Sequence, residues 1–398
     1  MKVAVVNLGC KVNRVESDSI AQAYLQRGSQ LVPYRDADTV VINTCTVTGE
    51  AEKKTRKTIR KILREAPQAN VLVTGCAATI NPEELQQLSD RVIIVPKSDL
   101  TDTYSSKRVG SQFPTRVGIK VQDGCNHACS YCIVHVARGK AWSRPIDDVV
   151  KEAKALASQG VKEIVLTGID MGSYAYFDGI KTYHLVDLLD RLVSNLDATR
   201  LRLSSIEPCS VSHSLIEFLA DNTDSVCRHL HLPLQSGSSK VLKEMYRPYD
   251  AETFLAICLS LKSFIPRLSL STDIIVGFPG ETEKDFEETL QVAKQVGFSK
   301  IHVFRYSKRQ GTPAAQRSDQ VESSIIERRE KELLSLAEQL RKQFAESLVG
   351  TEEDIVVEQA GIGTTESYFK VEVPNSIPSG SRICRTLTSY ETSGIFKS

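Results

Sequence analysis

The chain has 398 residues and a formal net charge of +1, with 41% hydrophobic and 25% charged residues. This length suits two to three domains, and the composition is that of an ordinary globular protein. No apolar run reaches the roughly 18 residues that span a membrane, which excludes a membrane-spanning protein, whereas the near-zero charge argues neither for nor against nucleic-acid binding.

The chain opens on a strand-like run at 1–7 and lacks the apolar stretch and cleavage site of a signal peptide. We therefore expect a cytoplasmic protein without membrane contact, and we expect a monomer. Cytoplasmic thiols stay reduced, so the 10 cysteines are better interpreted as metal ligands than as disulfides.

Residues 1–100 repeat one pattern, in which an apolar strand ends in a polar loop and a helix follows. We expect strands at 3–8, 39–43 and 71–74, and helices at 17–27, 49–65 and 82–88. Strands that alternate with helices predict an α/β domain with a parallel sheet. Cys10, Cys45 and Cys76 each stand one or two residues past a strand end, where ligands gather in such sheets. The sequence therefore predicts that they converge on one site, with three unrelated loop thiols as the alternative.

Residues 101–116 are polar and predict a linker, after which the alternation returns and lasts to about 306. We expect strands at 117–122, 163–167, 200–204, 229–232, 269–276 and 300–304, and helices at 146–158, 185–195, 212–220, 239–245, 251–264 and 283–296. Six β/α units are too few for a closed eight-stranded barrel, so they predict an open, partial one.

The last part of the chain changes character twice. Residues 321–346 carry apolar positions at helical spacing, which predicts a helix that completes a central domain at 117–346. Residues 347–398 contain short strands broken by glycine and proline, and they predict a small β-barrel domain.

Three cysteines stand within eight residues in the run Cys125-Asn-His-Ala-Cys129-Ser-Tyr-Cys132, in the loop after the first barrel strand. Thiolates at such short spacings can hold three irons of a 4Fe–4S cluster. The fourth iron would then stay open for a substrate or cofactor, by the logic that keeps one position free in catalytic metal sites. Buried structural thiols are the alternative.

The cysteine run and the stretch Gly277-Phe278-Pro279-Gly280-Glu281 after a buried strand together resemble the radical S-adenosylmethionine (SAM) superfamily. Several further stretches resemble its methylthiotransferase family over the whole chain. They include Asn7-Leu8-Gly9-Cys10-Lys11-Val12-Asn13, Asn43-Thr44-Cys45, Thr74-Gly75-Cys76, Ser204-Ser205-Ile206-Glu207-Pro208 and His231-Leu232-Pro233-Leu234-Gln235-Ser236-Gly237. The resemblance implies a parallel-sheet N-terminal domain, a central partial (β/α)6 radical SAM barrel and a small C-terminal OB-like β-barrel of the TRAM type.

Among the subfamilies, the Gly-Cys-Lys-Val-Asn run at Cys10 is most similar to enzymes that act on N6-threonylcarbamoyladenosine at tRNA position 37. Isopentenyladenosine enzymes tend to read Gly-Cys-Gln-Met-Asn there, and enzymes that act on a ribosomal-protein aspartate tend to read Gly-Cys-Pro-Lys-Asn. One departure is the run Val134-His135-Val136, where many members have a proline.

The resemblance assigns a role to each cysteine set and implies two 4Fe–4S clusters and SAM as cofactors. Cys125, Cys129 and Cys132 would hold the cluster that cleaves SAM to a 5′-deoxyadenosyl radical. Cys10, Cys45 and Cys76 would hold an auxiliary cluster that binds the sulfur to be inserted. The other four cysteines, Cys209, Cys227, Cys258 and Cys384, are predicted to be buried thiols.

The resemblance also implies contacts with SAM. Tyr131 is expected near the adenine, Ile274 and Gly277 along it, and Thr167-Gly168 at the amino group. Polar groups of SAM could also be reached from the end of the third barrel strand, by Ser204, Ser205 and Glu207. A helix cap or a buried polar network is the alternative for those three residues.

The implied activity adds a methylthio group to C2 of the adenine in the anticodon loop of tRNAs that decode ANN codons, with a reductant and a sulfur donor as further partners. The alternatives are another methylthiotransferase substrate, either isopentenyladenosine-37 or a ribosomal-protein aspartate, and an iron–sulfur RNA-binding protein without catalysis. Candidate RNA contacts, which could equally be solvated surface, are Lys53, Lys54, Arg56, Lys57, Arg60, Lys61 and Arg64, together with Arg138, Lys140 and Arg144.

Overall fold

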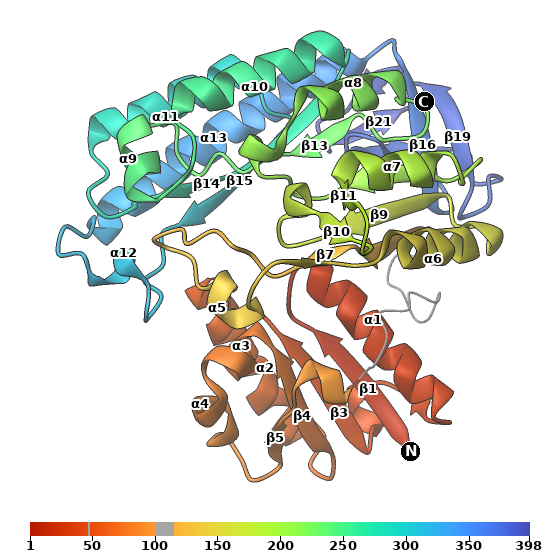
Figure 1. Ribbon diagram of the computed structural model, residues 1–398, viewed down its shortest axis with the longest axis vertical. Helices are drawn as coiled ribbons and strands as arrows, with labels where there is room; N and C mark the ends of the chain where they lie inside the picture. The colour runs from red at the N-terminus through yellow and green to blue at the C-terminus, as the bar shows by residue number, and fades with distance from the viewer. Residues whose placement is uncertain (47, 101–114) are drawn as a thin grey trace.

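The computed structural model describes residues 1–46, 48–100 and 115–398, which form three parts packed against one another (Figure 1). The N-terminal part, in red and orange, lies below an open barrel coloured yellow to cyan, and a blue C-terminal part packs against the barrel. The predicted linker lies outside the described residues except for Thr115 and Arg116, and Arg116 already belongs to a barrel strand. None of the described helices is both long and apolar enough to span a membrane.

The N-terminal part is a five-stranded parallel sheet in the order β2-β1-β3-β4-β5, with helices on both faces. Its strands are β1 (Lys2–Asn7), β2 (Gln30–Leu31), β3 (Thr39–Thr44), β4 (Asn70–Gly75) and β5 (Val92–Ile94). Its helices are α1 (Lys11–Gln26), α2 (Gly49–Glu65), α3 (Cys76–Ile80) and α4 (Pro82–Gln86). The predicted parallel sheet is confirmed, with two short strands added at its edges.

Helix α1 begins at Lys11, six residues before the predicted start at position 17. The first turn carries polar residues, which made it look like a loop, but Asn13 and Glu16 are both buried. Their polar atoms find hydrogen-bond partners on other segments, so a polar first turn can remain helical. As a result Cys10 is the cap residue of α1, and Cys76 likewise opens α3.

Six parallel strands form the barrel, in the chain order that the sequence predicts. They are β6 (Arg116–Lys120), β9 (Glu163–Thr167), β12 (Arg200–Leu203), β13 (His229–His231), β14 (Ser269–Val276) and β15 (Lys300–Arg305). Regular pairing is interrupted between β12 and β13. Leu201 N of β12 still donates to Ser225 O before β13 (2.7 Å), and Ile206 N after β12 donates to His231 O of β13 (3.0 Å).

Helices cover the outer face of the barrel and share one apolar core with the strands. They are α6 (Ile146–Ser158), α7 (Leu185–Val193), α8 (His213–Asp221), α9 (Ser239–Glu244), α10 (Ala251–Phe264), α11 (Glu283–Val296) and α13 (Ser323–Leu348). Alternate strand residues such as Leu201, Leu230 and Leu270 enter this core. The intervening residues, among them Arg202, His229 and Ser271, therefore face the barrel interior.

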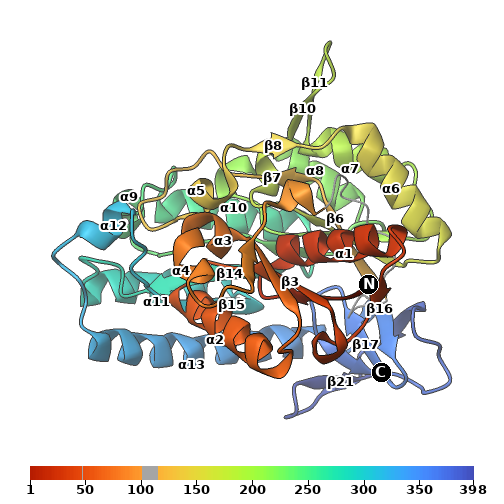
Figure 2. The same cartoon turned by 90° about the horizontal axis from the view of Figure 1, so that it is seen from below.

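The N-terminal part closes the opening that six strands leave between β6 and β15 (Figure 2). On one side, α1 packs on β6 so tightly that a Cβ at Gly118 would lie 2.5 Å from Val15 Cγ2. On the other side, Gly49 N at the start of α2 donates to Ser307 Oγ (3.1 Å), just after β15. The carboxyl ends of β3 and β4 are thereby brought to the mouth of the barrel.

The C-terminal part is a curled six-stranded sheet around its own apolar core, which includes Phe369 and Phe396. Its strands are β16 (Glu352–Gln359), β17 (Ile362–Thr365), β18 (Lys370–Glu372), β19 (Arg382–Thr386), β20 (Ser389–Tyr390) and β21 (Ile395–Lys397). The prediction that the C-terminal part is a small β domain is confirmed.

Several short elements were not predicted. Strands β7 (Gln122–Asp123) and β8 (Trp142–Ser143) flank the cysteine run, and α5 (Val134–Arg138) follows it. A hairpin of β10 (Ala175–Phe177) and β11 (Thr182–His184) projects from the barrel (Figure 2), and α12 (Pro313–Gln316) follows β15.

Candidate active site

The cysteine run forms a tight loop at the carboxyl end of the barrel, between β7 and α5. Gly124 has φ +72°, and a Cβ there would lie 2.0 Å from Lys140 O, so only glycine fits. Two sulfurs accept backbone hydrogen bonds, Cys125 Sγ from His127 N and Cys132 Sγ from Val134 N, each at 3.4 Å. Burial raises the pKa of both thiols to about 11, and Cys129 adds to both shifts, so the three thiols stand near one another.

These residues suit a 4Fe–4S cluster. All three cysteines are free, and the backbone N–H groups aimed at the sulfurs are donors that a thiolate ligand accepts. Arg247 Nη1 lies 3.2 Å from Cys129 Sγ and would oppose the negative charge of a cluster. Ligands of a four-iron cluster bind different irons, so their sulfurs need not converge around one ion.

A buried polar group surrounds the cysteine loop; of its members only Glu207 was predicted, as a SAM contact or as part of a buried polar network. Arg247 is bound by Glu207 and by the Tyr249 hydroxyl (2.9 Å), and burial raises the pKa of Glu207 although Arg247 opposes that shift. His127 Nε2 lies 3.2 Å from Asp170 Oδ2, and the buried Asp170 Oδ1 has no hydrogen-bond partner. A buried carboxylate oxygen without a donor is costly, so Asp170 is suited to receive a donor from a ligand.

A sequence signal existed for Asp170, because it stands three residues past the predicted strand at 163–167, where barrel ligands gather. No comparable signal pointed to Arg247, which follows the short helix α9 and reaches the cysteine loop only through the fold.

The predicted SAM residues fall into two sets. Thr167, Ser204 and Glu207 lie at the carboxyl ends of β9 and β12, but their side chains have protein partners. Thr167 Oγ1 donates to Ile119 O (3.2 Å) and Ser204 Oγ contacts Met171 Sδ (3.0 Å). Beside them, Gly168 lies against Gln122, and Ser205 bridges to His231 in the neighbouring strand.

The second set lies around Tyr131. Its partly buried ring packs on an apolar cluster with Met245, Phe278 and the partly buried Ile275. Ile274, which was predicted to lie along the adenine, is fully buried on the other face of β14, in the core shared with the helices. Gly277 has φ +77°, and a Cβ there would lie 2.3 Å from Ile326 Cγ1 of α13. Successive residues of a strand point to opposite faces of the sheet. The choice of Ile274 instead of its neighbour Ile275 therefore selects the opposite face.

The N-terminal cysteines gather at one edge of their sheet. Cys45 and Cys76 directly follow Thr44 and Gly75, which are paired neighbours on β3 and β4. Cys10 donates to Asn13 Oδ1 (3.2 Å), while Asn13 Nδ2 donates to Thr44 O (3.0 Å), so Asn13 ties the Cys10 loop to the Cys45 loop. Cys10 is exposed, and the other two are buried. Three thiols on neighbouring loops can hold a second cluster.

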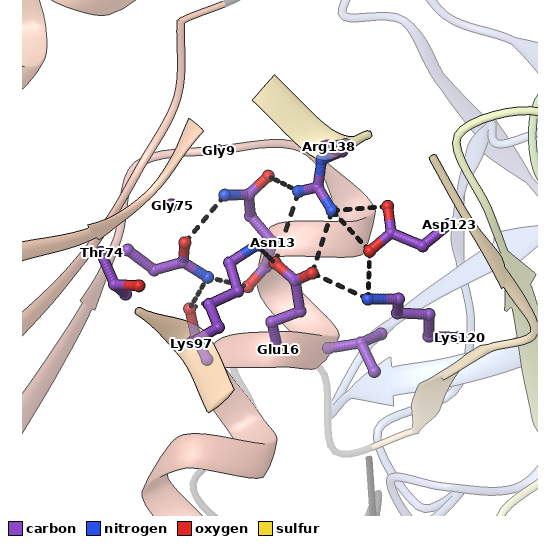
Figure 3. A network of polar contacts seen from close by, with 12 residues as sticks. Gly9, Asn13, Glu16, Thr74, Gly75, Lys97, Lys120, Asp123 and Arg138 are labelled. Carbon is purple, nitrogen blue, oxygen red and sulfur yellow. Dashed lines mark hydrogen bonds and ion pairs between the residues drawn. The ribbon is translucent and has the colours of Figure 1, made fainter. Parts of the chain in front are cut away.

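A buried network of charges joins Asn13 and Glu16 of α1 to Asp123 and Arg138, which flank the cysteine run of the barrel (Figure 3). Arg138, at the end of α5, donates to Glu16, Asp123 and Asn13, each at 2.9 Å. Glu16 also binds Lys97 and Lys120, and Lys120 pairs with Asp123. The expectation that Arg138 and Arg144 contact RNA is wrong, since their side chains are only 3% and 12% exposed and pair with carboxylates. Lys140 remains exposed.

The prediction that the four remaining cysteines are buried holds for Cys227 and Cys258 and is wrong for Cys209 and Cys384, which are exposed. Cys209 lies in a short turn after Glu207, and Cys384 lies on β19, the outermost strand of the C-terminal sheet. Position in a turn or on an edge strand leaves a side chain uncovered.

Helix α2 presents a basic face beside the Cys45 loop. Its buried face consists of Thr55, Ile59 and Ile62. The exposed basic residues are Lys53, Lys54, Lys57, Arg60, Lys61 and Arg64. Arg56 is partly buried and pairs with Glu84 (3.1 Å), so its guanidinium is less available to bind RNA than the exposed side chains of this face.

Two family models match the chain. Residues 119–293 match the radical SAM superfamily, and residues 2–96 match the uncharacterized protein family UPF0004. These two regions correspond to the barrel and to the N-terminal sheet.

Curated relatives resemble the chain over most of its length. The threonylcarbamoyladenosine tRNA methylthiotransferase MtaB of Bacillus subtilis is 38% identical, covering 93% of this chain and 89% of that protein. MtaB of Thermotoga maritima is 34% identical, with 93% and 91% covered. The tRNA-2-methylthio-N(6)-dimethylallyladenosine synthase of Desulfitobacterium hafniense is 33% identical, with 90% and 86% covered.

Solved structures of radical SAM enzymes share the fold. The methyltransferase TsrM from Kitasatospora setae, with cobalamin and a 4Fe–4S cluster bound, matches with a TM-score of 0.58 at 16% identity, covering 79% of this chain and 77% of TsrM. The cobalamin-dependent enzyme OxsB matches with a TM-score of 0.52 at 11% identity, covering 87% of this chain and 56% of OxsB. At these identities the likeness concerns the fold alone.

Proposed function

The chain belongs to the radical SAM tRNA methylthiotransferases, and on that premise we propose that it adds a methylthio group to C2 of N6-threonylcarbamoyladenosine at tRNA position 37. The observation that carries this proposal is the meeting of two three-cysteine sets from different domains across one seam. Asn13 contacts Cys10, and Arg138 connects Asn13 to the loop region of the other set. An enzyme that only cleaves SAM needs one such set, whereas sulfur insertion needs a second metal site beside it.

A radical SAM enzyme uses SAM and a 4Fe–4S cluster, and the residues of this chain that would hold that cluster are Cys125, Cys129 and Cys132. We propose that a second cluster is held by Cys10, Cys45 and Cys76. When bound, these groups supply the one-electron chemistry and the sulfur. The protein's own part is to fix both loops across the seam and to exclude water from the space between them.

We further propose how side chains hold SAM. The unpartnered Asp170 Oδ1 suits the amino group, and Tyr131 with Ile275 offers an apolar surface for the adenine. Ile275 replaces Ile274 in this role because Ile274 faces the helix layer. Thr167, Gly168, Ser204, Ser205, Glu207 and Gly277 would shape the pocket from the strand ends and the β14 turn.

The proposed partners are a tRNA anticodon loop of the ANN-decoding class, a one-electron reductant and a sulfur donor. Position 37 lies in a stacked loop, so its base must be turned out to reach a seam between two domains. We propose that the enzyme works in the cytoplasm as a monomer.

The proposed function is tested with the full chain, reconstituted with iron and sulfide without oxygen and given SAM and a reductant. The RNA is an anticodon stem-loop with N6-threonylcarbamoyladenosine, compared with one that carries isopentenyladenosine. Nucleoside mass spectrometry should detect the 2-methylthio product on the first RNA together with 5′-deoxyadenosine. Product on the second RNA alone would assign the other tRNA substrate, and no 5′-deoxyadenosine with either RNA would indicate a non-catalytic iron–sulfur protein.

We expect the basic face of α2 to bind tRNA phosphates. Lys53, Lys57 and Lys61 follow one another at four-residue spacing and form one exposed stripe. Replacing all three with glutamine should lower tRNA affinity by roughly tenfold at moderate salt and reduce the slope of log K against log salt by about two to three. Fluorescence anisotropy over a salt series measures both. The same change at Lys151, Lys154 and Lys342, also exposed, should leave both unchanged, and equal losses from the two triples would contradict the assignment.

A further inference from the structure

Tyr368 connects the C-terminal sheet to the inside of the barrel. It lies in the turn between β17 and β18 and has φ +62°, a left-handed conformation that is uncommon for a bulky residue. Such a conformation persists where the surroundings fix it, often near a functional site. The surroundings here are the Arg202 guanidinium, 4.0 Å from the ring centroid, and the His229 ring, at 4.9 Å and perpendicular to it. Both residues face the barrel interior.

The Tyr368 hydroxyl points to a lysine of the N-terminal part. Lys11 Nζ donates to Tyr368 Oη at 3.3 Å and lies 5.3 Å from the ring centroid. Lys11 directly follows Cys10 and is exposed. Within the described parts of the chain, no carboxylate lies within 4.0 Å of its ammonium group, whereas Arg202 nearby is paired with Glu163. Lys11 is therefore a cation that is held in place by an aromatic side chain and, among the residues that the structure describes, has no counter-ion.

The interior wall near Lys11 is polar. His231 Nε2 lies 3.2 Å from Asp273 Oδ2, and Asp273 is paired in register with His302 on the next strand. Ligand-capable atoms of these three side chains lie within 4.8 Å of one another, the one such group among the described residues. Ser271 Oγ joins His231 Nδ1 (3.0 Å) to His229 (3.1 Å). The His229 ring lies 4.9 Å from the ring of Tyr368, whose hydroxyl accepts from Lys11, and this contact connects Lys11 to the wall.

We propose that Lys11, held by the Tyr368 hydroxyl, is an anion subsite that binds the carboxylate of the N6-threonylcarbamoyl group. This inference rests on the proposed function. The cluster that Cys10 would hold would supply sulfur to C2 of the base, and C6, which carries the substituent, is separated from C2 by N1 alone. A cation on the residue after Cys10 is thus on the side of the base where the substituent lies.

The carboxylate is what distinguishes this substituent from an isopentenyl group, which offers an ammonium no acceptor. Hydrogen bonds between an ammonium and a carboxylate are roughly twice as strong as neutral ones. Lys11 is exposed before the substrate binds, so the pair gains this strength where the bound base covers the ammonium group from water. The subsite therefore confers substrate specificity, and part of it comes from the C-terminal domain.

The test uses the cluster-loaded full chain and two anticodon stem-loops, one with the free threonylcarbamoyl acid and one with its methyl ester. The ester keeps the shape and removes the charge. The wild type should bind the acid about tenfold more tightly than the ester, and K11Q should bind both equally within about twofold. K11R should keep most of the preference, and Y368F, which removes the hydroxyl and keeps the ring, should lose part of it. K151Q, an exposed lysine on α6, should bind as the wild type does.

Two results would overturn the subsite. One is equal binding of acid and ester by the wild type, and the other is a full preference for the acid in K11Q. If K11Q loses its absorption spectrum because the cluster beside it is disturbed, K11R and Y368F decide the question. Formation of 5′-deoxyadenosine without RNA monitors the other cluster and should not change in K151Q. If the wild type shows the preference but never forms the methylthio product, the proposed function fails and the anion subsite stands.

Discussion

Replacing Cys125 with alanine should abolish 5′-deoxyadenosine formation, whereas replacing Cys10 should leave it and abolish the methylthio product. Each change removes one of three ligands from one cysteine set, and a cluster held by two thiolates is easily lost. Cys125 lies on the loop after β7 and Cys10 at the start of α1, so one loss does not remove the ligands of the other set. SAM cleavage and sulfur insertion should therefore separate into two variants.

Iron analysis and anaerobic activity assays check this expectation. The wild type should hold about eight irons per chain and each variant about four. Cys384→Ala is the matched control, because Cys384 is an exposed cysteine of the C-terminal sheet outside both sets. Loss of 5′-deoxyadenosine in the Cys10 variant, with all of the iron still bound to the other loop, would contradict the division between the two sets.

The elements that position the cysteines could be predicted because they depend on local patterns. Buried parallel strands are continuous apolar runs, and β3, β9 and β14 stand within one residue of their predicted bounds. Since carboxyl ends of parallel strands meet at one edge, Cys45 and Cys76 could be placed together without coordinates.

The residues that escaped prediction depend on contacts between segments far apart in the chain. Arg138 follows the cysteine run and looks like a surface cation, but its partners Glu16 and Asn13 are more than 100 residues away. Tyr368 and Lys11 are likewise brought together only by the packing of three domains. The choice of Ile274 over Ile275 has a different cause, because β14 ends in the apolar run Ile274-Ile275-Val276, within which polarity does not distinguish the two faces.

Replacing Glu16 with glutamine should be the most destabilising change in the network of Figure 3. Burial alone would raise the pKa of Glu16, but Lys97, Arg138 and Lys120 outweigh it and hold that pKa well below its usual range. The carboxylate is thus charged, and without it Arg138 and Lys120 share Asp123, while Lys97 loses the carboxylate that it binds. Removing one partner of a buried ion group costs about 3–5 kcal/mol. Denaturant unfolding at pH 7 should show a loss of this size.

The sign of the pH dependence follows from the lowered pKa. A carboxyl whose pKa is lower in the folded than in the unfolded state stabilises the fold above its unfolded pKa, and this contribution is lost as the pH falls. The wild type should therefore lose stability progressively below about pH 5, as the unfolded pKa near 4.3 is reached and passed. In Glu16→Gln this part of the acid dependence should be absent, and an unchanged profile would show that Glu16 is not the group responsible.

A double variant separates the charge of the network from its packing. Arg138→Met removes one of the three cations that Glu16 neutralises, so adding it to Glu16→Gln should relieve repulsion among those that remain. The double variant should then lose less stability than the two single losses together, by about 1–3 kcal/mol. A strictly additive result would mean that the two side chains act independently. In that case the network would no longer explain how the two cysteine loops are coupled. Arg138 contacts Asn13, and Asn13 contacts Cys10, within this same network.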